Sequence, residues 1–219
     1  MKEITMSAEI TPTPRIGDDA PDFTAITTHG EITFSDWQED NWVILFSHPA
    51  DFTPVCTTEL TEFASRNAEF SDRGIKLIGL SIDSIHSHVA WVQNINEIMG
   101  TKIPYPLIAD LDMKVANKYG LIHPGESSTA TVRAVFIIDP NRKIRALIYY
   151  PLANGRNVDE VVRLIDSLQT TDSNSCATPV NWNVGEKVIV PPPKTEAEVE
   201  DRLNSDHEKL SFYLMKRDL

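Results

Sequence analysis

The stretch Phe46-Ser-His-Pro-Ala-Asp-Phe-Thr-Pro-Val-Cys-Thr-Thr-Glu-Leu60 decides the expected fold, because an apolar strand ends there and an amphipathic helix begins. Pro49 and Pro54 forbid a continuous helix across it, so the helix is predicted to start near Val55 or Cys56. At a helix start, unpaired backbone N–H groups and the helix dipole favour thiolate over thiol. Position alone leaves two alternatives for Cys56, a reactive thiol and a buried structural cysteine.

Apolar runs on both sides of this stretch predict a βαβ unit. The runs 42–46 and 75–82 are typical of buried strands, and the helix between them is expected to stop at Gly74. The remaining expected elements are a helix ending at Gly100, a strand at 106–109, a short helix at 112–119, antiparallel strands at 131–138 and 144–150, and a helix at 158–169. The order βαβ, an inserted βα, then ββα is typical of a thioredoxin-like sheet, which is an α/β fold.

The sequence pattern divides the chain into three parts. Residues 1–15 are predicted to form an irregular N-terminal segment, and residues 16–170 the thioredoxin-like domain, with a small β element around 22–26. Residues 171–219 are expected to form a small C-terminal α+β extension with a strand at 187–190. Apolar residues recur at helical spacing in this extension, and either the same chain or a second subunit would cover them. They are Val199, Leu203, Leu210 and Leu214.

Charge and cysteine content argue against several classes of protein. A formal net charge of -12 disfavours a nucleic-acid partner, because phosphates would be repelled over most of the surface. Two cysteines, Cys56 and Cys176, are too few for a secreted disulfide framework, which favours a reducing compartment. No apolar run has the length of a signal-peptide core or a membrane span, so we expect a cytoplasmic protein without membrane contact.

The residues before Cys56 suggest the chemistry of its thiol. Thr53 can donate and accept a hydrogen bond, and Pro49 can shield a thiolate from bulk water. A thiolate that attacks a peroxide O–O bond needs an ionised sulfur, donors that hold the oxygens in line, and charge stabilisation on the departing oxygen. The pattern Pro-x-x-x-Thr-x-x-Cys can supply all of these except a fixed positive charge.

Residues 46–60 resemble the active-site signature of peroxiredoxins, specifically the one-cysteine (peroxiredoxin-6-like) class of the AhpC/TSA family. The resemblance continues through segments 104–106, 133–140, 150–151, 155–157 and 177–182, and covers nearly the whole chain from about Ile16. It implies a thioredoxin-like fold with peroxiredoxin insertions and a C-terminal extension used in dimerisation. The implied activity is a thiol-specific peroxidase that reduces hydrogen peroxide and organic hydroperoxides through a sulfenic acid at Cys56. It further implies no cofactor, and a homodimer that can assemble to a decamer.

The family pattern assigns expected roles to individual residues. Cys56 matches the peroxidatic cysteine, and Thr53 and Pro49 match the residues that shape the peroxide pocket. Arg133 matches the arginine that stabilises the thiolate and transition state; without the resemblance, a solvent-facing strand arginine would be the simpler interpretation. His48 and Glu59 are expected to support the site, Glu59 by orienting the arginine. His86 and His88 are expected to be a solvated helix start, and no metal site is expected.

The chain departs from the two-cysteine pattern near Cys176. Members of that class resolve the sulfenic acid with a C-terminal cysteine just before a tryptophan, whereas Cys176 lies six residues before Trp182. We therefore expect an external thiol, such as thioredoxin or glutathione, to complete turnover, with a resolving role for Cys176 as the alternative. Two other functions stay open, an oligomeric holdase chaperone and a peroxide sensor. The absence of Cys-x-x-Cys excludes a dithiol electron carrier.

Overall fold

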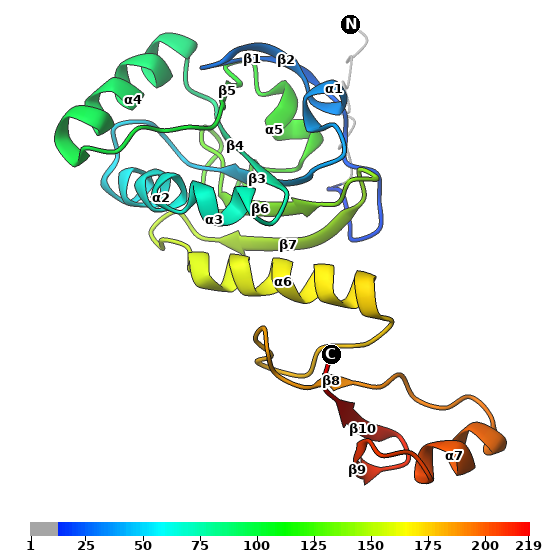
Figure 1. Cartoon of the computed structure of the whole chain (residues 1–219). Coiled ribbons are helices and arrows are strands. Elements are labelled where there is room, and N and C mark those ends of the chain that lie inside the picture. The colour runs from blue at the N-terminus through cyan, green and yellow to red at the C-terminus, as the bar shows by residue number, and fades with distance from the viewer. Residues whose placement is uncertain (1–12) are drawn as a thin grey trace, which may run out of the picture. The chain divides into compact units, whose positions relative to one another are not determined.

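The structure is a computed structural model that describes residues 13–219. It divides into two compact units, one ending at Arg156 and the other spanning Asn157–Leu219 (Figure 1). Most of the predicted irregular segment, residues 1–12, lies outside the described residues. The predicted boundary near Thr170 falls inside a helix, α6 (Val158–Asn174). No helix among the described residues is long and apolar enough to cross a membrane.

A seven-stranded sheet forms the centre of the first unit, with the strand order β2-β1-β5-β4-β3-β6-β7. The strands are β1 (Thr24–Thr27), β2 (Gly30–Thr33), β3 (Trp42–Ser47), β4 (Ile75–Ser81), β5 (Leu107–Ala109), β6 (Arg133–Ile138) and β7 (Ile144–Tyr150). β3, β4 and β5 are parallel, and β6 runs antiparallel to both β3 and β7. The predicted βαβ unit and the predicted hairpin are both confirmed.

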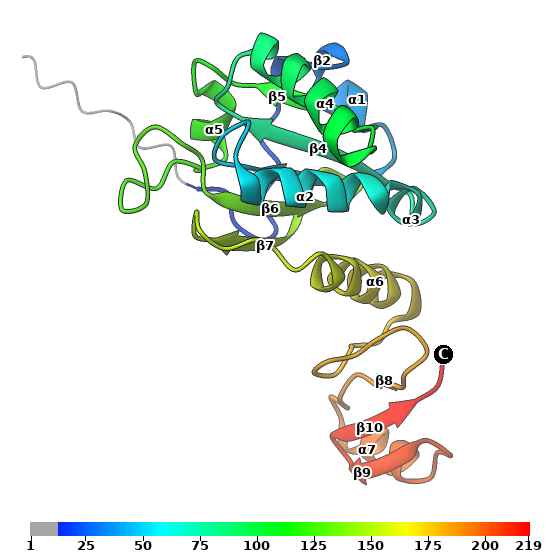
Figure 2. The ribbon, with the colours of Figure 1, turned by 90° about the vertical axis from the view of Figure 1, so that its left-hand side faces the viewer.

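Five helices accompany this sheet. They are α1 (Phe34–Gln38), α2 (Pro54–Ser65), α3 (Asn67–Ser71), α4 (Ile85–Met99) and α5 (Lys114–Lys118). α2 and α4 lie on one side of the sheet, and α1 and α5 on the other (Figures 1 and 2). The prediction of a single helix up to Gly74 is wrong in one respect, because the helix is interrupted at Arg66, between α2 and α3. The left-handed Gly100 ends α4 as predicted.

Strand alternation determines which side chains reach α2. In β6, Ala134, Phe136 and Ile138 belong to the core cluster that includes residues of α1 and α5. Successive side chains of a strand point to opposite faces, so Arg133 projects toward the α2 face. On that face Phe46 of β3 stacks on Phe63 of α2, with ring centroids 4.4 Å apart. This apolar contact fixes α2 against the sheet and brings its first turn to the strand end that carries Arg133.

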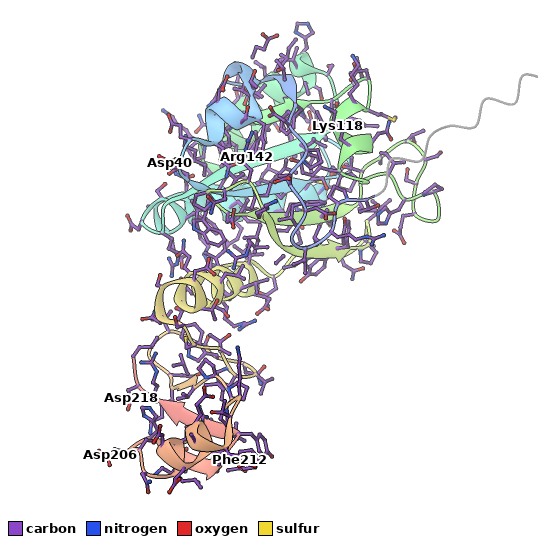
Figure 3. The ribbon with its side chains drawn as sticks, turned by 90° about the vertical axis from the view of Figure 1, so that its right-hand side faces the viewer. Asp40, Lys118, Arg142, Asp206, Phe212 and Asp218 are labelled. Atoms are coloured by element: carbon purple, nitrogen blue, oxygen red, sulfur yellow. The ribbon has the colours of Figure 1, made fainter. Side chains whose placement is uncertain are left out.

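The second unit contains α6 and a small three-stranded sheet. β8 (Val188–Ile189) and β9 (Glu208–Ser211) both pair with β10 (Leu214–Arg217), and α7 spans Glu196–Leu203. Figure 3 labels Asp206 before β9, Phe212 in the turn between β9 and β10, and Asp218 after β10. The α+β composition of the extension is as predicted, but its helical face is shorter than expected. Leu210 and Leu214 lie on strands because α7 ends at Leu203 and a hairpin follows.

Candidate active site

Cys56 lies in the first turn of α2, as the prolines predict. Pro54 takes the first helical position, where its missing N–H costs no hydrogen bond, and Thr53 is the residue before it. The helix therefore starts one residue earlier than expected. Cys56 is fully buried, which by itself would fit the structural alternative, but its sulfur is in contact with a charged group.

That charged group is the guanidinium of Arg133. Its Nη1 donates to Cys56 Sγ over 3.2 Å and to Glu59 Oε2 over 2.7 Å, while Nε donates to the carbonyl of Leu152 over 2.9 Å. Arg133 is only 3% exposed, so a solvent-facing strand arginine is ruled out. Within residues 13–219 no hydrogen bond involves Nη2, which leaves that nitrogen able to donate to a bound molecule. The structure thus supplies the positive charge that residues 46–60 lack.

A second buried guanidinium, Arg156, shares the carboxylate of Glu59. Its backbone N and Nε donate to Glu59 Oε1, and Nη2 donates to Oε2 over 2.7 Å. Nη1 donates to the carbonyls of Ser47 and Ala134, each over 2.9 Å, so the same side chain links β3, β6 and α2. Sequence reasoning missed Arg156 as a site residue. The signal was its place in the matched segment 155–157, to which no role was attached.

The formal charges of this cluster are balanced only when sulfur is ionised. Two guanidinium groups face the single carboxylate of Glu59, and a thiolate at Cys56 neutralises the second positive charge. Burial raises the pKa of Glu59, but the charges and hydrogen bonds of Arg156, with the charge of Arg133, outweigh it and hold the pKa below its usual value. Glu59 is therefore a fixed negative charge that holds both arginines. The arrangement can stabilise an anionic sulfur in a site closed to bulk water.

Replacing Glu59 with glutamine is expected to destabilise the protein by about 3–5 kcal/mol, because two buried guanidinium groups lose their counter-charge. The lowered pKa of Glu59 also determines how this stabilisation depends on pH. The contribution of Glu59 to the free energy of unfolding is complete above the usual glutamate pKa, and it is lost as the pH falls through the lower pKa of the folded state. Urea unfolding at pH 7 and at pH 3 measures both effects. Glu62→Gln is the matched control, since Glu62 lies on the same helix with 51% of its side chain exposed. Equal unfolding free energies for the two variants would contradict the prediction.

Thr53 and Pro49 lie in the segment between β3 and α2. Thr53 Oγ1 donates to the carbonyl of Ala50 over 2.8 Å, so its hydrogen is engaged and its lone pairs can accept from another molecule. Pro49 is half-buried directly after His48. Between them Phe52 has a φ of 54° and is 57% exposed, an uncommon conformation for a bulky residue that turns the chain into the helix.

His48 belongs to a buried cluster with Asp51 and His88. His48 Nε2 lies 3.0 Å from Asp51 Oδ1, and His88 Nδ1 lies 2.8 Å from Asp51 Oδ2. The expectation that His88 is solvated is therefore wrong, whereas His86 is exposed. In the described part of the chain, His48, Asp51 and His88 are also the one group of three or more His, Cys, Asp or Glu residues whose ligand-type atoms all lie within 4.8 Å of one another. Hydrogen bonding through the shared carboxylate explains that spacing.

Cys176 is half-buried in the second unit, after the end of α6. Its Sγ lies 3.9 Å from the carbonyl of Thr170, a weak S–H contact, and both cysteines are free thiols. The described structure therefore contains no disulfide between Cys56 and Cys176. A resolving role for Cys176 stays the alternative that the sequence left open.

Comparison with known proteins identifies similar chains over nearly the full length. The sequence model of the AhpC/TSA family matches residues 16–147, and that of the C-terminal domain of 1-Cys peroxiredoxin matches residues 167–205. A peroxiredoxin of Aquifex aeolicus is 51% identical over 219 residues, which cover 95% of this chain and 99% of that protein.

Two solved structures share the same architecture. A yeast mitochondrial 1-Cys peroxiredoxin superposes with a TM-score of 0.85 at 43% identity, covering 94% of this chain and 99% of its own. A variant of peroxiredoxin 6 of Arenicola marina gives a TM-score of 0.84 at 38% identity, with coverage of 93% and 97%. The predicted thioredoxin-like α/β fold is thereby confirmed.

Proposed function

Because this chain belongs to the AhpC/TSA family of peroxiredoxins and is a thiol-dependent peroxidase, we propose that Cys56 is the thiol that attacks the peroxide. The supporting observation is the 3.2 Å contact between Cys56 Sγ and the buried guanidinium of Arg133. The comparisons give no better support to a holdase chaperone or a peroxide sensor, the two alternatives from the sequence.

In the proposed step, the Cys56 thiolate attacks one peroxide oxygen. An S–O bond forms, the O–O bond breaks, and its electron pair leaves with the other oxygen, which takes a proton to become water or an alcohol. Arg133 stabilises the thiolate through Nη1 and, through the unengaged Nη2, can donate to the departing oxygen. Thr53 accepts from the peroxide O–H, and Pro49 limits access of water. Glu59 and Arg156 keep Arg133 in place.

An external thiol is proposed to restore Cys56. The sulfenic acid condenses with one thiol to give a mixed disulfide and water, and a second thiol displaces Cys56 as the thiolate. Family membership implies a peroxide substrate and a thiol reductant, and the similarity to 1-Cys proteins favours external resolution over resolution by Cys176. The yeast relative is described as resolved through glutathione and thioredoxin systems. We propose the same class of reductant here.

Assembly and location are proposed on more general grounds. We propose a homodimer that can assemble to a decamer, on the basis of family membership, and gel filtration with light scattering measures the assembly. A reducing compartment such as the cytoplasm fits two free thiols, one of which must be reduced for each turnover.

Intact-mass spectrometry after one equivalent of hydrogen peroxide tests the chemistry of Cys56. We expect a gain of one oxygen, trapped on Cys56 by a sulfenic-acid reagent, and an adduct on Cys56 when glutathione is added. The Cys176→Ser protein should give the same two products. A Cys56–Cys176 disulfide, seen as a loss of two hydrogens in the wild type alone, would contradict external resolution and assign the resolving role to Cys176.

A further inference from the structure

Three buried side chains form a chain of hydrogen bonds between the segment after β3 and the start of α4. His48 and His88 are fully buried, and 1% of the Asp51 side chain is exposed. The Asp51 carboxylate lies between the two imidazole rings and accepts from both. Its backbone N–H donates to Asp83 Oδ2 over 3.1 Å, and Ser81 Oγ holds the same Asp83 oxygen over 2.6 Å. The two histidines therefore hold the carboxylate of Asp51, and Asp83 holds its backbone.

The hydrogen-bond partners of His88 define its protonation. Nε2 lies 3.0 Å from the carbonyl of Ile108 on β5, and Nδ1 lies 2.8 Å from the carboxylate of Asp51. Both partners can only accept, so both ring nitrogens carry hydrogen and the ring is an imidazolium. Burial lowers the pKa of His88, but Asp51, with smaller contributions from the Ile108 carbonyl and Asp83, raises it above its usual value.

The same reasoning leaves His48 neutral. Its Nε2 faces the Asp51 carboxylate and so carries the hydrogen. Burial lowers the pKa of His48, and the positive charge of His88 acts in the same direction, against Asp51 and Asp83. Nδ1 is then a bare lone pair, and no group in residues 13–219 makes a hydrogen bond to it. A buried acceptor without a partner is uncommon and points to a molecule that binds during function.

We propose that His88 is a positioning residue for the peroxidase reaction. It acts through Asp51 to hold His48 as the neutral Nε2–H tautomer, so that His48 Nδ1 accepts from the O–H of hydrogen peroxide that Thr53 does not bind. Asp51 alone could not do this, because an unpaired carboxylate beside His48 would favour the imidazolium, which cannot accept. His88 cancels that charge while Asp51 still orients the ring. The proposal rests on Cys56 as the reacting thiol.

The variant His88→Asn separates charge from hydrogen bonding. Asparagine Nδ2 can still donate to Asp51 but carries no charge, so His48 should take up a proton at a higher pH than in the wild type. Between pH 8 and pH 6, we expect the second-order rate constant of His88→Asn for peroxide to decrease by a factor about ten times larger than that of the wild type, because protonated His48 no longer accepts a hydrogen bond. His86→Asn, an exposed histidine two residues earlier in the same helix, is the matched control. A pH profile of His88→Asn equal to that of His86→Asn would overturn the proposal.

Nitrogen NMR of the wild-type histidine rings provides a second test that needs no variant. At pH 7.5 we expect both nitrogens of His88 to be protonated and His48 to carry hydrogen on Nε2 only. A neutral His88, or a hydrogen on Nδ1 of His48, would overturn the proposal even if His88→Asn does not fold. These signals do not depend on Cys56 chemistry, so a failed assignment of Cys56 would appear separately, as peroxide consumption that survives Cys56→Ser.

Discussion

Peroxide consumption is expected to fall by at least about a thousandfold when Cys56 is replaced by serine, because a serine hydroxyl is not ionised near neutral pH and cannot replace the thiolate. The substitution exchanges sulfur for oxygen in a fully buried position, and Arg133 can still donate to the hydroxyl. The folded state should therefore survive. Hydrogen peroxide loss in the presence of excess dithiothreitol measures the activity, and thermal unfolding measures the fold.

Cys176→Ser is the matched control for that experiment. It removes the other free thiol of the chain, which is half-buried in the second unit. With dithiothreitol as reductant, its activity should equal that of the wild type, since the small thiol reaches the sulfenic acid directly. Full peroxide turnover by Cys56→Ser would disprove the assignment of the reacting thiol, and with it the proposed role of Arg133.

Replacing Arg133 with methionine is expected to lower the second-order rate constant for peroxide by about 100- to 1,000-fold, the range found when one preorganised donor to a developing charge is removed. Methionine retains much of the apolar stem but neither the contact to Cys56 Sγ nor the unengaged Nη2. Stopped-flow oxidation of the reduced protein isolates this step. Glu59 keeps its bonds to Arg156, so we expect a folded protein.

One further variant separates charge from geometry at this position. Arg133→Lys keeps a positive charge but not the planar fork that reaches Cys56, Glu59 and Leu152 together, so its rate should lie between those of methionine and wild type. Arg145→Lys is the matched control. Arg145 lies near the turn of the β6–β7 hairpin, at the end opposite to Arg133, and pairs with Asp139. A wild-type rate in Arg133→Met would show that the guanidinium does not act on the reaction.

Local patterns in the sequence were sufficient to predict the Cys56 segment. Pro49 and Pro54 restrict where α2 can start, and the apolar runs on either side place that start at the end of β3. The β6–β7 hairpin followed from two apolar strands around the turn at 139–142. These features depend on contacts between near neighbours, which periodicity and turn residues encode directly.

Local patterns could not predict which side chains pair when they lie far apart in the sequence. Arg156 lies 97 residues from Glu59, and His88 lies 37 residues from Asp51, so neither pairing leaves a local signal. His88 also occupies an early turn of α4, where a polar residue is ordinarily solvated. The error at Leu210 and Leu214 has another cause: widely spaced apolar residues fit a helix and a hairpin equally well until a turn such as 212–213 is recognised.

The pairing register of β6 has a consequence for protein engineering. Arg133 faces Cys56 only because Arg133 pairs with Tyr150 on one side and Phe46 pairs with Val135 on the other. A shift of one residue would present Ala134 to the sulfur and turn the guanidinium into the apolar layer opposite. Grafting residues 46–60 onto another scaffold would therefore transfer a cysteine at a helix start but no peroxidase activity. The graft would also need the alignment of a strand that begins 73 residues after Leu60.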